Sequence, residues 1–296
     1  MEIRKVPERQ ISERELVTVT RMNHVIEVQH MEKCNKKSHI KKLDAERYMD
    51  IETGEIKEFD RTETRAEGLN SLRQTFKKLR YLINNNFIGA PNELFITLTF
   101  RGDLQTNDHI RVGEDYKNFL KRLKYAYKDQ ATIEAIKVLE PHQSGNWHMH
   151  VLLRFDGMEK IFIENERLAE IWGNGFVQIQ SLKDVDNIGA YVSAYLTDIE
   201  VTADNVLNVA GAGYEVKEHE GKYFAKGARL AYYRSGVNIY SKTKGIKYPE
   251  RVEMSYKQAK KIVGAGTPHY KKSIAISDDE IDCSNTITYE QYNLKR

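Results

Sequence analysis

The sequence predicts an α+β fold in which helices pack on one side of an antiparallel sheet. From residue 93 onward, strand-like and helix-like segments follow one another in the order β-α-β-β-α-β-α, and a short turn joins the two adjacent strands. This order favours an antiparallel layer over a doubly wound parallel sheet, in which every strand needs a crossover. The composition, 40% hydrophobic and 30% charged over 296 residues, is typical of a soluble globular protein.

Hydrophobic periodicity locates the individual elements. Helices are predicted where apolar residues recur at steps of three and four, and strands where β-branched and aromatic residues are dense. Asp108 is suited to cap the second helix and Gly173 to end the third. In chain order we predict a helix at 62–86, a strand at 93–100, a helix at 108–127, strands at 132–140 and 147–155, a helix at 164–173, a strand at 175–182, and helices at 186–198 and 255–263.

We expect three consecutive parts along the chain. Residues 1–61 form an N-terminal extension with a β-hairpin around Thr53-Gly54, and residues 62–200 form the central domain. Residues 201–296 form a C-terminal extension in which the periodicity weakens. This extension combines a basic segment, 222–251, with an acidic tail in which four residues cluster: Asp278, Asp279, Glu280 and Asp282.

Membrane and secreted proteins are excluded by what the sequence lacks. It contains no run of 18 or more apolar residues, so no membrane span is predicted, and its N-terminus lacks the apolar core of a secretion signal. The two cysteines, Cys34 and Cys283, are far apart, which indicates neither a disulfide framework nor a cysteine-based zinc site. We therefore expect a cytoplasmic protein without a membrane partner.

Positive charge is concentrated in three stretches, although the net charge is only +3. The stretches cover residues 71–81, 115–128 and 222–251, and tyrosines are interleaved with their bases. One basic stretch is ordinarily a solvated surface, but three with aromatic residues favour a nucleic-acid partner. The predicted DNA-binding residues are Lys121, Arg122, Lys124, Lys183, Lys222, Lys226 and Arg229.

Residues 139–155, "LEPHQSGNWHMHVLLRF", place histidines in a strand that is otherwise apolar. Side chains alternate between the two faces of a strand, so His148 and His150 share one face and Met149 points to the other. A single histidine on a strand is ordinarily a core or surface residue. A His-x-His pair with an acidic residue nearby is also the ligand set of a divalent metal that keeps open positions for substrate oxygens.

The register of the hairpin decides which residues join the two histidines. If residues 144–146 form a three-residue loop, Glu140 lies opposite His150 and His142 lies opposite His148. This register would gather three imidazoles and a carboxylate on one patch. A change of one residue in the register would separate them.

A second segment, "DNIGAYVSAYLTD", is predicted to be a helix capped by Asp186. Tyr191 and Tyr195 are four residues apart and therefore lie on one face of this helix. Core packing alone would explain such a pair. A tyrosine hydroxyl, with an ordinary pKa of about 10, is a poor nucleophile at neutral pH unless a metal polarises the phosphate that it attacks. The histidine strand and the tyrosine helix thus explain one another.

The segments "LFITLTF", "NWHMHVLL" and "WGNGFVQIQSLKDVDNIGAYVSAYL" resemble, in order and spacing, the three motifs of HUH endonucleases. More narrowly, the chain resembles the rolling-circle replication initiators (Rep proteins) of plasmids, phages and integrative elements. The resemblance covers residues 93–200. It implies that residues 62–200 are a nuclease domain with an RRM-like or ferredoxin-like sheet of five antiparallel strands, with the histidines on a central strand and the tyrosines on a facing helix.

The resemblance also implies a metal, a substrate and a reaction. Mn²⁺ or Mg²⁺ would be held by His148, His150 and a third ligand, for which we expect Glu140, with His142 as the substitute. The substrate would be single-stranded or extruded origin DNA, nicked and rejoined at a specific site and strand. Tyr191 is expected to form the 5′-phosphotyrosine bond that starts rolling-circle replication, and Tyr195 to act at termination.

One departure from the family pattern concerns positive charge. Members with two tyrosines often have lysines just before the second tyrosine and three residues after it, where this chain has Ala194 and Asp198. Another base would then serve the phosphate, with three candidates: Lys183, Lys222 and Arg229. The chain also lacks the phosphate-binding sequence GxxxxGKS, so a separate host helicase and DNA polymerase are expected as partners.

Two further interpretations stay open. The same chemistry serves relaxases and single-strand transposases, although relaxases commonly place the tyrosine before the histidines and such transposases are usually shorter. A catalytically inactive DNA-binding regulator on the same scaffold would explain Ala194 and Asp198. A metal hydrolase for small molecules leaves the basic stretches unexplained.

Overall fold

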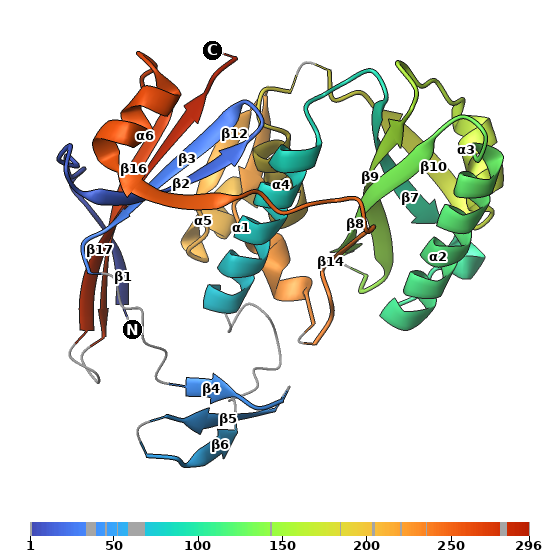
Figure 1. The fold of residues 1–296 in the computed structure, drawn as a ribbon. Helices are drawn as coiled ribbons and strands as arrows, with labels where there is room; N and C mark the ends of the chain where they lie inside the picture. The colour runs from blue at the N-terminus through green and yellow to red at the C-terminus, as the bar shows by residue number, and fades with distance from the viewer. Residues whose placement is uncertain are drawn as a thin grey trace. The chain divides into compact units, whose positions relative to one another are not determined.

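The computed structural model describes residues 2–33, 40–44, 46–51, 53–58, 69–142, 144–183, 185–202, 205–219, 221–234, 236–278 and 283–295. The chain forms two compact units, one of residues 1–61 with 249–296 and one of residues 62–248 (Figure 1). The structure thus groups the segments differently from the three expected consecutive parts, because residues 201–248 pack with the central domain and the last 48 residues pack with the N-terminal ones. Within the described ranges no helix has the length and apolarity that crossing a membrane requires.

The unit of residues 62–248 is built on a five-stranded sheet with the order β10-β7-β9-β8-β14. Every neighbouring pair is antiparallel. Four strands lie where the sequence predicted them, whereas β14 comes from the segment after residue 200, where no element was expected. The strands are β7 (Glu93–Phe100), β8 (Thr132–Pro141), β9 (Trp147–Asp156), β10 (Gly175–Gln180) and β14 (Tyr240–Lys242).

Helices cover both faces of this sheet, so the expectation of helices on one side is wrong. On one face, Nζ of Lys137 lies 5.1 Å from the ring centroid of Tyr116 in α2. On the other face, the ring of Phe95 contacts Tyr191 in α4. The helices of the unit are α1 (Leu69–Asn86), α2 (His109–Ala126), α3 (Asn165–Trp172), α4 (Ile188–Thr197) and α5 (Val206–Gly211), with 3₁₀ turns at Gly102–Leu104 and Ala228–Tyr232.

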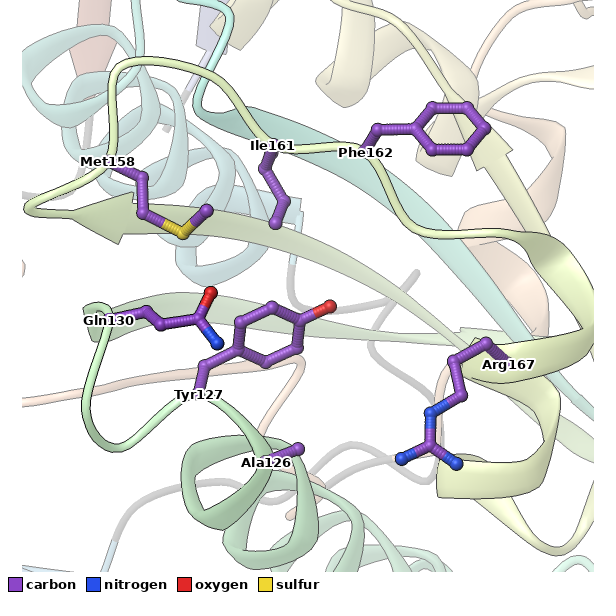
Figure 2. Close-up of a pocket in the computed structure, with 7 residues that line it drawn as sticks. All are labelled: Ala126, Tyr127, Gln130, Met158, Ile161, Phe162 and Arg167. Atoms are coloured by element: carbon purple, nitrogen blue, oxygen red, sulfur yellow. The ribbon is translucent and has the colours of Figure 1, made fainter.

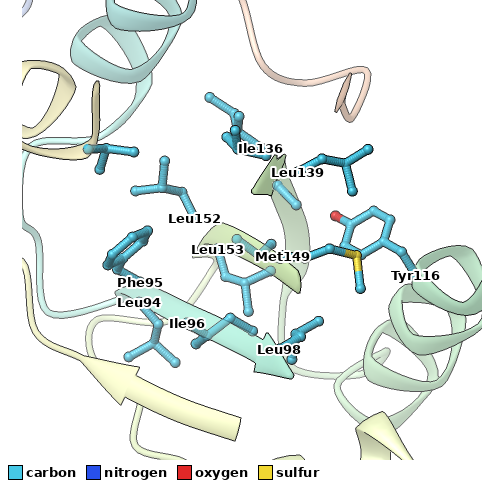
Figure 3. Close-up of a cluster of buried hydrophobic side chains, with 14 of the residues drawn as sticks. Leu94, Phe95, Ile96, Leu98, Tyr116, Ile136, Leu139, Met149, Leu152 and Leu153 are labelled. Carbon is cyan, nitrogen blue, oxygen red and sulfur yellow. The ribbon is translucent and has the colours of Figure 1, made fainter. Parts of the chain in front are cut away.

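The reason for this two-sided cover is visible in β8 and β9, which are buried on both faces. Such strands need an apolar layer on each side. Figure 3 shows Met149 of β9 pointing toward Tyr116, on the side away from the histidines. The predicted capping residues Asp108 of α2 and Gly173 of α3 are confirmed, Gly173 with the left-handed φ of 73°.

A small three-stranded sheet follows α4 directly. Its order is β11-β13-β12, and all pairs are antiparallel. The strands are β11 (Ile199–Val201), β12 (Val216–His219) and β13 (Lys222–Ala225). The chain continues from β13 into the 3₁₀ turn at Ala228–Tyr232.

The second unit contains a six-stranded antiparallel sheet with the order β1-β16-β17-β3-β2-β15. Residues 270–293 were expected as part of an acidic tail but form a hairpin inside this sheet; Asp279, Glu280 and Asp282 lie outside the described residues. The elements are β1 (Glu2–Val6), β2 (Leu16–Met22), β3 (Val25–Met31), β15 (Arg251–Ser255), α6 (Tyr256–Val263), β16 (Tyr270–Asp278) and β17 (Cys283–Asn293).

The predicted N-terminal hairpin is confirmed as part of a separate small sheet. Its strands are β4 (Ile40–Lys42), β5 (Arg47–Asp50) and β6 (Ile56–Glu58). β5 and β6 pair antiparallel, and Gly54 between them has a φ of 72°, which glycine adopts without strain. Cys34 lies outside the described residues.

Candidate metal and tyrosine site

The hairpin of β8 and β9 places the predicted ligands in a register different from the expected one. Glu140 lies opposite His148, and Val138 lies opposite His150. The expected register is wrong because the turn closes one residue earlier, with the backbone N–H of His142 donating to the carbonyl of Asn146 (2.8 Å). Gly145 then takes the left-handed φ of 82° that ends a three-residue hairpin loop.

This register error moves the pairing by two residues, so every side chain keeps its face. Glu140 therefore lies on the same face as His148 and His150, opposite one and diagonal to the other. The Nε2 atoms of both imidazoles hydrogen-bond with the same Glu140 oxygen, Oε2. One donor atom from each of the three residues lies within 4.8 Å of the others. We call these three residues the metal group.

The donor chemistry of the metal group fits a divalent cation of the Mn²⁺ or Mg²⁺ class. It offers two imidazole nitrogens and one carboxylate oxygen, a set that leaves coordination positions for other oxygens. Glu140 and His150 are buried, whereas the His148 side chain is partly exposed, so the group has an open side.

His150 is oriented by two residues of β7. The Thr97 hydroxyl and Nδ1 of His150 share a hydrogen bond of 3.0 Å. The ring of Phe95 stacks on the imidazole, with the centroids 5.6 Å apart and the planes 23° apart. With Nδ1 held by Thr97, the Nε2 atom is turned toward Glu140. Neither residue was predicted, although the alternation in "ITLTF" places Thr97 and Thr99 together on one face.

The protonation of the buried pair suits cation binding. Burial alone raises the pKa of Glu140, but hydrogen bonds from His148 and His150 outweigh it and bring the pKa below its ordinary value. Burial lowers the pKa of His150. At neutral pH the pair therefore presents a carboxylate and a neutral imidazole, the forms in which these side chains ligate metals.

His142, the predicted substitute ligand, does not belong to the metal group in the described part of the chain. Its side chain is exposed, and its Nδ1 hydrogen-bonds with the hydroxyl of Ser144 (3.3 Å). Its ring centroid is 6.2 Å from that of His148. The two-residue change in register explains this, because His142 now lies beyond the end of β8.

The helix that carries the tyrosines is held against α1 by asparagines. Asn187 caps α4, accepting from the N–H of Ala190 (3.0 Å) and from the side-chain amide of Asn84 in α1 (2.9 Å). Asn84 also accepts from the N–H of Gly189 (2.7 Å). The prediction that Asp186 caps this helix is therefore wrong by one residue, because Asn187 satisfies the helix and the neighbouring helix together.

Tyr191 lies one aromatic ring away from the metal group. Its side chain is 41% exposed, and its ring packs edge-on against Phe95, with the centroids 6.4 Å apart. Phe95 in turn stacks on His150. Tyr195 belongs to α4 by its backbone, but its side chain lies outside what the structure describes.

Gly189 allows the close approach of α4 to α1, which leads to a prediction. A Cβ at this position would lie 2.6 Å from the carbonyl oxygen of Arg80. We expect Gly189→Ala to lower the free energy of unfolding by about 1–3 kcal/mol, as overpacked sites do, in urea titrations. Gly113→Ala in α2 is the control: nothing lies within 4 Å of its Cβ, so it should stabilise by up to about 1 kcal/mol. Equal effects of the two variants would contradict the close fit.

Arg229 is the predicted cation that reaches the metal group. Its Nη1 forms an ion pair with Oε1 of Glu140, and its side chain is only 19% exposed. Its Nε and Nη2 donate to the backbone carbonyl of Asp198 (3.3 and 3.1 Å). The Asp198 carboxylate accepts from the N–H of Gly227 (2.9 Å), so the residue that replaces a lysine of the family pattern instead anchors the segment carrying Arg229.

A buried tyrosine, which sequence reasoning missed, fastens the same segment. The Tyr233 hydroxyl donates to the carbonyls of Leu139 (3.1 Å) in β8 and Leu196 (3.4 Å) in α4. The end of β8, the end of α4 and residues 227–233 are thereby joined around Glu140.

The other predicted DNA-binding residues lie elsewhere. Lys222 and Lys226 are exposed and pair with Glu200 (3.1 Å) and Glu215 (3.6 Å). Arg122 donates to the carbonyls of Ile171 and Trp172 (2.7 Å each) at the end of α3. Lys183 is exposed in the loop after β10, and Lys121 and Lys124 belong to α2, on the sheet face opposite to the histidines.

A pocket of about 380 Å³ lies on the α2 side of the sheet and is separate from this site. Figure 2 shows its lining, in which none of the predicted site residues takes part: Ala126, Tyr127, Gln130, Met158, Ile161, Phe162 and Arg167.

Comparison with known proteins gives one match. A family model for replication-associated proteins of the ORF2 type matches residues 93–200, which are 108 of the 296 residues. The matched segment contains the metal group and both tyrosines but ends before Arg229. The predicted resemblance to a replication initiator is confirmed over this segment. No curated protein matches the chain.

Proposed function

We propose that residues 62–248 nick and rejoin single-stranded DNA through Tyr191, and that this reaction initiates rolling-circle replication of a plasmid, phage or integrative element. The observation that carries the proposal is the contact series from His150 to Phe95 to Tyr191, which brings a nucleophile beside a set of metal ligands. The match to a replication-associated family over residues 93–200 supports it. So does the arrangement of the histidines on the middle strand of five, with the tyrosine on a facing helix, as HUH endonucleases would have it.

Glu140, His148 and His150 would hold the cation, Mn²⁺ or Mg²⁺. When bound, such a cation polarises a phosphate and offsets the negative charge that develops during attack. Thr97 and Phe95 keep the His150 ring in place. The guanidinium of Arg229 lies beside the carboxylate of Glu140, where it adds positive charge for a phosphate diester.

The proposed reaction is a transesterification. The hydroxyl oxygen of Tyr191 bonds to phosphorus, the bond from phosphorus to the 3′ oxygen breaks, and the proton of the tyrosine passes to that leaving oxygen. The DNA then carries a free 3′-hydroxyl that primes synthesis, and its 5′-phosphate is esterified to the protein. Attack by a 3′-hydroxyl reverses the step and joins a strand. Tyr195 would supply a second round at termination, and a host helicase and DNA polymerase would extend the nick.

The test is covalent adduct formation. The full chain is mixed with Mn²⁺ and labelled single-stranded DNA tiled from the neighbourhood of its own gene, and SDS-resistant, protease-sensitive species are counted. We expect an adduct that Tyr191→Phe and His148→Ala abolish and Tyr195→Phe retains. Loss in Tyr195→Phe alone would transfer the first attack to Tyr195. DNA binding without any adduct in the wild type would instead favour an inactive DNA-binding regulator.

A further inference from the structure

The face of the sheet that carries the metal group continues, uncovered, to the edge strand β10. Phe176 and Gln178 are exposed on this strand, Phe176 to 70%. The alternate residues Val177 and Ile179 pack against the core. An exposed phenylalanine on a strand whose other face is buried lacks a reason in folding alone.

Register shows that Phe176 and Gln178 face the same side as the histidines. Gln178 lies opposite Thr97, and Thr97 lies opposite His150, to which its side chain bonds. Phe176 is two residues from Gln178 and lies opposite Thr99, so it shares this face. Neighbouring strands are about 4.8 Å apart, which puts the backbone of β10 about 10 Å from the histidine strand.

The chemistry of this strip suits unpaired nucleotides. It offers an aromatic ring for stacking, the amide of Gln178, and the hydroxyls of Thr97 and Thr99. The Oε1 atom of Gln180, on the same face of β10, is buried and has no hydrogen-bond partner among the described residues. It is therefore an acceptor that a base amino group can satisfy.

Cations lie at both ends of the strip. Arg101 follows β7 directly, is 57% exposed and pairs with the exposed Asp103, while its backbone N–H bonds to Asn174 just before β10. Lys183 is exposed three residues after β10 ends. A single strand crossing from the metal group over β10 thus meets positive charge on either side of the aromatic ring.

We propose that Phe176 is a stacking platform for an unpaired DNA base close to the scissile phosphate, with Gln178 contacting the edge of that base. The cleavage part of this statement rests on the proposed function, whereas the binding part requires single-stranded DNA only. The occupant is single-stranded DNA because the strip is continuous with the metal group and combines stacking, amide and cationic groups.

Tryptophan fluorescence tests the stacking directly. Both natural tryptophans, Trp147 and Trp172, are buried, so Phe176→Trp adds an exposed reporter. We expect a dT oligonucleotide to quench the Phe176→Trp emission, and an abasic oligonucleotide of the same length to quench it much less. The control is Phe162→Trp, because Phe162 is 78% exposed beside the pocket on the α2 side. Equal quenching of the two variants, or equal quenching by the abasic strand, would overturn the stacking.

Affinity provides the second arm. Stacking of one base on an aromatic residue corresponds to about a fivefold or larger loss of affinity on truncation. We expect Phe176→Ala to bind fluorescent dT at least about fivefold more weakly than the wild type, and Phe162→Ala to bind like the wild type. Mn²⁺ binding should be unchanged in both. Unchanged DNA affinity of Phe176→Ala, or loss of a wild-type dimer in its place, would overturn the proposal.

The two proposals fail in different ways. If the wild type forms no adduct but Phe176→Trp is quenched by dT, the nicking proposal fails and the stacking platform stands. If the wild type forms an adduct and Phe176→Ala binds dT normally, the platform alone fails. At saturating DNA, Phe176→Ala should still form the adduct, because its side chain contacts none of the reacting atoms.

Discussion

Replacing His150 by alanine is expected to abolish Mn²⁺ binding, measured by titration calorimetry, and with it covalent attachment to DNA. His150 is buried, its Nε2 meets Glu140, and its Nδ1 meets Thr97. Loss of an outer partner of a metal ligand commonly weakens affinity by 10- to 100-fold, so loss of the ligand itself should exceed about 100-fold. Thr97→Val, which removes only the orienting hydroxyl, should fall within about 10- to 100-fold.

His142→Ala is the matched control for this prediction. It removes an imidazole whose ring centroid is 6.2 Å from that of His148 but which does not join the metal group. We expect its Mn²⁺ affinity to stay within about threefold of the wild type, since a residue that is not a ligand contributes little. Thermal melts of all three variants verify that they fold. Retention of Mn²⁺ by His150→Ala, or an equal loss in His142→Ala, would refute the assignment of ligands.

Removal of Arg229 should change two affinities in opposite directions. The guanidinium pairs with Glu140 and therefore opposes a second cation at the same carboxylate. Arg229→Leu should bind Mn²⁺ about tenfold more tightly, because repulsion between charges a few ångströms apart is strong in a partly buried site. The same variant should bind single-stranded DNA more weakly and form the adduct at least about tenfold more slowly, because a cation beside the phosphate is lost.

Two variants separate charge from structure in this prediction. Arg229→Lys keeps the charge but loses the pair of donors to the Asp198 carbonyl, so it should fall between the wild type and Arg229→Leu. Arg234→Leu removes an exposed base of the same segment and should leave Mn²⁺ affinity unchanged. Weaker Mn²⁺ binding in Arg229→Leu would indicate that the arginine supports the carboxylate rather than competing with a cation.

The elements that carry the site follow from local sequence. Strand alternation alone puts His148 and His150 on one face and Met149 on the other, and this holds in the structure. The expected register was wrong by two residues because the turn chemistry around Gly145 decides where the loop closes. A shift by an even number preserves the face, so Glu140 still joins the histidines while His142 does not.

Long-range pairing was beyond sequence reasoning. β14 is three residues long, too short for a recognisable period, yet it completes the five-stranded sheet by pairing with β8. The contact of Arg229 with Glu140 depends on the same returning segment. β16 and β17 pair with β1 and β3, near the opposite end of the chain. Strand partners so far apart leave no local signal, because pairing is selected by the whole core rather than by neighbouring residues.

The central claim is that Tyr191 attacks DNA beside the metal group, and mass spectrometry of the adduct tests it most directly. Tryptic digestion after Lys183 and Lys217 releases both tyrosines of α4 in one peptide, and fragmentation locates the nucleotide within it. We predict a 5′-phosphonucleotide on Tyr191 that requires Mn²⁺ and is lost in His150→Ala. A nucleotide on a residue outside α4, or an adduct that persists in His150→Ala, would contradict the account.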